Sequence, residues 1–226
     1  MRFIEEAPQP RPILFQGPPN GAGAATPDRA SLERHLARSR YGRFTLTAAI
    51  RPGWQLDIMP EEGYRFDAYS DPRTGTRLPA IVASVSSERL FDTFLSLLEP
   101  LGDVCDVVLE TSHSNDASAH GDHVREGMER LVLESTLWDF EELLLDDGCT
   151  GIAVMHPELP MEVQLDEHKL IVVYAPSRSP FEAILDSMGI PRNDSIRFIS
   201  QGEHLHTSHT RFARRFEELQ TLLGAG

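Results

Sequence analysis

Cysteine and lysine are scarce in this chain of 226 residues. Its two cysteines, Cys105 and Cys149, are too few for a disulfide framework and are not spaced as in a zinc knuckle. Each lies among apolar residues, so we expect two reduced and buried thiols. Lys169 is the only lysine among 21 basic residues. The scarcity of cysteine therefore excludes the small secreted folds that depend on disulfides.

Long apolar runs are also absent. No stretch approaches the roughly 20 apolar residues that a membrane helix needs, and residues 1–6, which prolines follow, do not resemble a signal peptide. We therefore expect a cytoplasmic protein. The formal net charge of -14, from 21 basic and 35 acidic residues, would repel a phosphate backbone. Nucleic acid and membrane are thus not expected partners.

What the chain does contain is a Pro/Gly-rich start followed by alternating strand and helix patterns. Residues 1–27 lack apolar periodicity, which predicts an extended or disordered arm. Apolar alternation and turn residues predict strands at 44–50, 64–69, 78–85, 104–109, 151–155, 161–165, 170–174 and 196–199. Helical spacing predicts helices at 28–41, after Ser87, at 122–145, around Phe181 and from Phe212 to Leu223.

The order of these elements repeats, and so do some of their apolar side chains. At an offset of 90 residues, Phe91 matches Phe181, Leu95 matches Leu185 and Leu98 matches Met188. Internal repetition is a signal for the fold itself, although two α+β segments can also share an order by chance.

We predict an α+β protein of two similar tandem halves with mostly antiparallel sheets covered by helices. Each half would run roughly helix, three strands, helix, strand. The first half is residues 28–121 and the second is residues 148–226, and they share a long central helix at 122–147. The halves either pack through this helix or form one continuous sheet of about eight strands.

Charge is unevenly distributed along the chain. Residues 126–147 hold eight acidic residues against one arginine, whereas residues 29–43 hold five arginines against one acidic residue. Such segments are commonly solvated helix faces. Alternatively, the Arg-rich helix at 29–43 docks on an acidic protein surface, including the acidic 122–147 helix of another copy of this chain.

Histidine is concentrated where strands are predicted to lead into helices. Residues 120–125 and 206–211 both have the pattern His-x-x-His-x-Arg. Two further histidines precede the patterns, so six of the nine histidines fall in two matching segments: His113, His120, His123, His204, His206 and His209. The last residue of each pattern is an arginine, Arg125 or Arg211.

Three interpretations of these segments compete. The six histidines could bind a divalent transition metal such as zinc. Alternatively, a helix N-terminus with Arg125, Arg211, His123 and His209 could bind an anion such as phosphate or another small ligand. In the third interpretation the histidines are polar loop residues or helix caps.

No complete catalytic pattern accompanies the histidines. The sequence has no HExxH, no Walker A loop, no GxGxxG between strand and helix, and no GxSxG. We therefore predict a binding or protein-interaction module without an identifiable catalytic constellation. The alternative is a metal-dependent or phosphate-handling enzyme that uses the two histidine segments.

Overall fold

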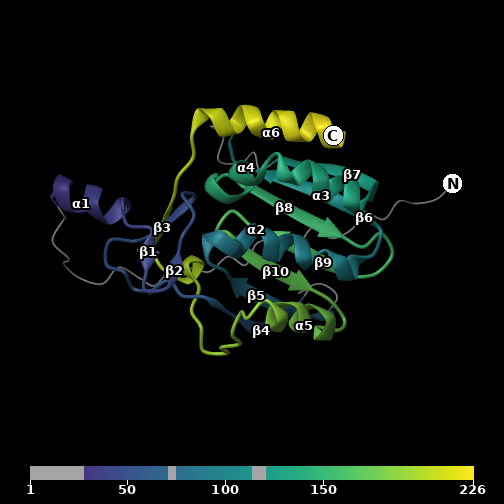
Figure 1. Cartoon of the computed structure of the whole chain (residues 1–226), viewed down its shortest axis with the longest axis horizontal. Helices are drawn as coiled ribbons and strands as arrows, with labels where there is room; N and C mark the ends of the chain where they lie inside the picture. The colour runs from purple at the N-terminus through teal and green to yellow at the C-terminus, as the bar shows by residue number, and fades with distance from the viewer. Residues whose placement is uncertain (1–27, 71–74, 114–120) are drawn as a thin grey trace.

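A seven-stranded antiparallel sheet forms the centre of the protein in a computed structural model that describes residues 28–70, 75–113 and 121–226 (Figure 1). Its strand order is β4-β5-β10-β9-β8-β6-β7. The α+β class and the mostly antiparallel pairing are as predicted. The strands are β4 (Gly63–Ser70), β5 (Arg77–Ser84), β6 (Val104–Thr111), β7 (Gly121–Glu129), β8 (Thr150–Met155), β9 (Glu162–Leu165) and β10 (Leu170–Tyr174).

Five helices share one hydrophobic core with the sheet. Alternate strand residues such as Ile81, Leu109 and Val173 join helix residues such as Phe94 and Phe216 in a single buried cluster. Because strand side chains alternate between faces, these helices must cover the same face of the sheet, as Figure 1 shows. They are α2 (Ser87–Ser96), α3 (Arg130–Trp138), α4 (Glu141–Asp146), α5 (Ser179–Ser187) and α6 (Thr210–Leu223).

Smaller elements pack at one end of the sheet. On the opposite face, Ile196 and Phe198 pack with Val82 and Leu170. The 3-10 turns are η1 (Glu99–Leu101) and η2 (Ile199–Gln201). The other elements are α1 (Arg29–Leu36), β1 (Arg40–Tyr41), β2 (Phe44–Thr45), β3 (Ile50–Pro52) and β11 (His204–His206), with β1 paired to β2 and β3 paired to β11. Within the described ranges no helix is long and apolar enough to cross a membrane.

The predicted central helix at 122–147 is wrong. Its first part is strand β7, which pairs with β6 along the edge of the sheet. Gly127 has a φ of 64°, a left-handed conformation that suits glycine, and its N–H donates to Asp106 Oδ1 at 2.7 Å beside an irregularity in the pairing. The remainder is two short helices, α3 and α4. Long-range pairing with β6 thus overrides the local helical pattern at 122–129.

The two predicted tandem halves are not confirmed. Strands β8, β9 and β10 of the predicted second half lie between β4-β5 and β6 of the first, so neither half has a sheet of its own. The observed arrangement is closer to the alternative of one continuous sheet.

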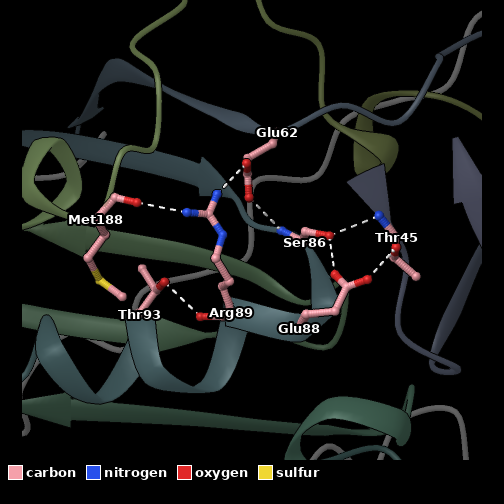
Figure 2. Close-up of polar contacts among 7 residues, drawn as sticks. All are labelled: Thr45, Glu62, Ser86, Glu88, Arg89, Thr93 and Met188. Carbon is pink, nitrogen blue, oxygen red and sulfur yellow. Dashed lines mark hydrogen bonds and ion pairs between the residues drawn. The ribbon is translucent and has the colours of Figure 1, made fainter. Parts of the chain in front are cut away.

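A polar network fixes the N-terminus of α2 against neighbouring segments (Figure 2). The Glu88 carboxylate accepts hydrogen bonds from the Ser86 hydroxyl and, at 2.7 Å, from the Thr45 hydroxyl. Glu62 accepts from the Ser86 N–H at 3.0 Å and from Arg89, which also donates to the Met188 carbonyl at 2.7 Å. The network therefore ties β2 and the approach to β4 to the start of this helix.

Replacing Glu88 with glutamine should lower the free energy of unfolding by about 1 kcal/mol at pH 7. Hydrogen bonds from Ser86 and Thr45 lower the pKa of Glu88 to about 2. The folded state thus favours the charged carboxylate, a contribution that is complete above the ordinary pKa of 4.5 and is lost as the pH falls towards 2. Because Glu88 is exposed, solvent screening keeps the effect small.

Urea denaturation of both proteins at several pH values measures this difference. The gap between wild type and Glu88→Gln should close as the pH falls towards 2. Asp92→Asn on the same helix is the control, because Asp92 is exposed and outside the network. A gap of constant size at every pH would contradict the assigned role of the carboxylate.

Candidate metal centre

Three histidines from two distant segments meet at one end of the sheet. His204 and His206 lie two residues apart on β11, so their side chains point to the same side of the strand. β11 is held by its pairing with β3, in which His206 lies opposite Ile50. His168 comes from the turn between β9 and β10. We call His168, His204 and His206 the three-histidine cluster.

Asp166 and Lys169 hold the turn that carries His168 in place. Asp166 Oδ1 accepts from the Leu170 N–H at 2.8 Å. Lys169 has a left-handed backbone, with a φ of 59°, and is 5 % exposed. Its ammonium group donates to the Thr150 carbonyl at 2.7 Å, and burial lowers its pKa to about 8. The only lysine of the chain therefore holds this turn onto the start of β8.

The three imidazoles are close enough to share one metal ion. The ring centroids of His168 lie 4.9 Å from those of both His204 and His206, and the latter two are 5.1 Å apart. One ring nitrogen from each histidine lies within 4.8 Å of the other two. All three side chains are half-buried, so the cluster is sheltered but reachable from solvent. Imidazole nitrogen is a preferred ligand of zinc and related ions.

Hydrogen bonds set the orientation of each ring. Nδ1 of His204 lies 2.8 Å from the Gly202 carbonyl, and Nδ1 of His206 lies 2.8 Å from the Gly148 carbonyl. A carbonyl oxygen only accepts, so both Nδ1 atoms carry the proton and the neutral rings have a free lone pair on Nε2. Nδ1 of His168 lies 3.0 Å from Asp166 Oδ2 in the same way. Metal-binding histidines are oriented by the same kind of outer hydrogen bond.

The surroundings shift the pKa values of His168 and His206 in opposite directions. Burial lowers the pKa of His206, and the nearby His168 lowers it further, against the effect of its hydrogen bond to Gly148. Burial also lowers the pKa of His168, but the hydrogen bond and charge of Asp166 outweigh it, so the net pKa is raised.

Two of the six histidines predicted as metal ligands lie in this cluster, namely His204 and His206. Three of the others lie elsewhere: His113 beside Asp147, His123 beside Gln220, and His209 exposed before α6. The sixth, His120, lies outside the described residues.

The predicted anion site is not assembled as expected. His123 and Arg125 lie on strand β7, so the helix N-terminus expected beside them does not exist. Arg211 does lie in the first turn of a helix, α6, but its guanidinium donates to Glu142 at 2.7 Å. His209 is exposed next to that helix. The four residues are therefore distributed over two separate elements.

His168 was missed in the sequence because it stands alone in the turn Asp166-Glu167-His168. The signal that was present is the alternation of His204 and His206, which on a strand places two imidazoles side by side. Nothing local indicates that a turn much earlier in the chain supplies the third.

The prediction of two free and buried thiols is confirmed in part. Both cysteines are free and Cys105 is buried, but Cys149 is partly exposed.

Comparison with known proteins adds no further assignment. No family model, no curated protein and no solved structure matches the chain, so the candidate site rests on its own residues.

Proposed function

We propose that this protein is a binding module whose ligand is a divalent transition metal of the zinc class, held by the three-histidine cluster. The observation that carries the proposal is the hydrogen-bond pattern that the three rings share. Each Nδ1 is bonded to an oxygen acceptor, which leaves three Nε2 atoms as the available ligands. A cluster of histidines packed only for stability has no need for this shared arrangement.

A metal-dependent enzyme is the alternative function. Three protein ligands leave the fourth position of a tetrahedral ion open, as in catalytic zinc sites. However, the cavity that borders His168 holds about 20 Å³ and is not lined by His204 or His206, so it is not a substrate pocket at the cluster. The phosphate-handling form has less support, because Arg125 and Arg211 lie on different elements. Metal binding itself is thus the better-supported role.

The protein-interaction role of the Arg-rich segment stays a prediction. Helix α1 buries none of its residues, and Arg29 is paired with Glu33 on the same helix at 2.7 Å. The helix is therefore available for a contact with an acidic surface, including a second copy of this chain, although the predicted acidic 122–147 helix is divided into a strand and two helices.

Metal analysis of untagged protein tests the proposed function. After incubation with zinc and removal of the excess, the wild type should retain zinc, and His168→Ala, His204→Ala and His206→Ala should each retain one equivalent less. His209→Ala is the matched control, because it removes an exposed imidazole outside the cluster. Equal zinc content in all five proteins would refute the proposal.

Asp166 should act as a positioning residue for the metal. Asp166→Asn is expected to weaken zinc binding about 10- to 100-fold, because the amide orients the His168 ring less strongly than a carboxylate. Competition with a chromophoric chelator measures the affinity. Glu167→Gln removes the same charge from the same turn without removing the hydrogen bond to His168, and should have a much smaller effect. Equal effects of the two substitutions would assign the contribution to charge alone.

A further inference from the structure

A second group of ligand-type side chains lies beside the strand that follows α4. It consists of His113, Asp147 and Cys149, and one ligand atom from each lies within 4.8 Å of the other two. Asp147 and Cys149 flank Gly148, and His113 follows β6, which pairs with β8. The group is separate from the three-histidine cluster in its residues, although Gly148 contacts both.

Asp147 is the most unusual member of this group. Its side chain is 0 % exposed, yet one carboxylate oxygen, Oδ1, has no hydrogen-bond partner within the described part of the chain. The other oxygen accepts from Thr150 Oγ1 and lies 2.9 Å from His113 Nε2. Buried carboxylates are normally fully paired or bound to a metal, because desolvating an unpaired oxygen is costly.

His113 makes a contact through each of its two ring nitrogens. Nδ1 of His113 lies 2.8 Å from Thr111 Oγ1, which also accepts from the His113 backbone N–H at 3.3 Å. The Thr111 hydroxyl can donate to Nδ1 or accept from it. His113 Nε2 therefore either carries the proton that bonds to Asp147 Oδ2 at 2.9 Å or presents a lone pair to a cation.

The charge and chemistry of the group match a divalent ion. A carboxylate and a thiolate carry two negative charges, and the neutral imidazole adds a third ligand. Mixed nitrogen, oxygen and sulfur ligands are typical of zinc and cobalt and not of magnesium or calcium. Cys149 is partly exposed, and the exposed Ser208 places its hydroxyl 3.4 Å from His113 Nε2, so an ion has a route to the site.

From these contacts we propose that His113, Asp147 and Cys149 form a second binding site for a divalent transition metal of the zinc class. The ion is bound by His113 Nε2, a carboxylate oxygen of Asp147 and Cys149 Sγ. On binding, the Cys149 thiol loses its proton to solvent as the sulfur–metal bond forms, and no oxidation or reduction takes place. The site is independent of the three-histidine cluster, so either can bind a metal without the other.

Cobalt(II) titration of the reduced full-length protein tests the second site. A thiolate ligand gives an intense near-ultraviolet charge-transfer band, which imidazole ligands do not give. We expect this band in wild type and its loss in Cys149→Ser. Cys105→Ala is the matched control and should keep the band, because Cys105 is buried in the core outside the group. His204→Ala should also keep it.

Each outcome decides the proposal. Absence of the band in folded wild type, or its survival in Cys149→Ser, would overturn the second site and leave a simple hydrogen-bonded histidine–carboxylate pair. If His204→Ala keeps its full zinc content but the band behaves as expected, the three-histidine proposal fails and the second site stands.

Thiol alkylation of the unmodified chain gives a check that does not depend on how a variant folds. Zinc should slow the reaction of Cys149 with iodoacetamide about tenfold or more, because a metal-bound thiolate is no longer free. Magnesium should not slow it, since it prefers oxygen ligands. An unchanged alkylation rate in zinc would also overturn the proposal.

Discussion

Zinc is expected to raise the melting temperature of the metal-free protein by about 5–10 °C when it is present at about a hundred times its dissociation constant. A ligand that binds only the folded state stabilises it by about 2.7 kcal/mol at this concentration. For a chain of this size, each kcal/mol corresponds to about 2–4 °C. The unfolded chain cannot bring His168 to His204 and His206, so it competes weakly for the ion.

The experiment isolates the three-histidine cluster when it is performed in the Cys149→Ser background. The shift should persist in that variant and should disappear when His206→Ala is added. Magnesium at the same concentration is the control and should leave the melting temperature unchanged. If zinc shifts Cys149→Ser and its His206→Ala derivative equally, the histidines are not the ligands.

The substitution Gly148→Ala is expected to lower the free energy of unfolding by about 2–4 kcal/mol and to abolish zinc binding at the three-histidine cluster. A Cβ atom at this position would lie 2.6 Å from the Ala49 carbonyl oxygen and 2.8 Å from that of Thr207. Both neighbours are backbone atoms that cannot rotate away. The Gly148 N–H also donates to Thr207 at 2.8 Å, and its carbonyl orients His206.

Gly189→Ala is the matched control for this prediction. Gly189 has a φ of 69°, and no described residue places an atom within 4 Å of the position that a Cβ would take. Its substitution therefore strains only the backbone, at about 1 kcal/mol, and should leave zinc content unchanged. Denaturation and metal analysis of both variants give the comparison. If Gly148→Ala has the free energy of unfolding and the zinc content of wild type, the prediction is wrong and the backbone around Gly148 can accommodate a Cβ atom.

The spacing of apolar residues correctly predicted helices and strands whose buried side chains are close together in the sequence. The spacing of Phe212, Phe216, Leu219 and Leu223 predicted a helix, and all four side chains are buried in α6. Strands at 64–69 and 78–85 were predicted from apolar alternation and turn residues, and they are β4 and β5, which pair with each other. In both cases the residues that define the element are neighbours in the chain, so the sequence carries the information directly.

The pattern failed where partners distant in the chain decide the structure. At 122–129 a helical continuation was predicted, but β6 offers an unpaired edge, and pairing with it satisfies the backbone of residues that bury little. Helices α2 and α5 are present at the two places that the offset of 90 residues matches, but the duplication itself is not confirmed. The matching pattern did not indicate that strands of both segments join one sheet, because similarity of elements does not determine their pairing.

By itself, the sequence determined the α+β class, the apolar faces of the main helices and the concentration of histidine near residues 204–209, because each of these depends on residues close together in the chain. Only the tertiary structure decided that His168 meets His204 and His206, and that His113 meets Asp147 and Cys149. These contacts depend on the pairing of β11 with β3 and of β6 with β8. Such pairing is set by burial across the whole sheet, which no local window contains.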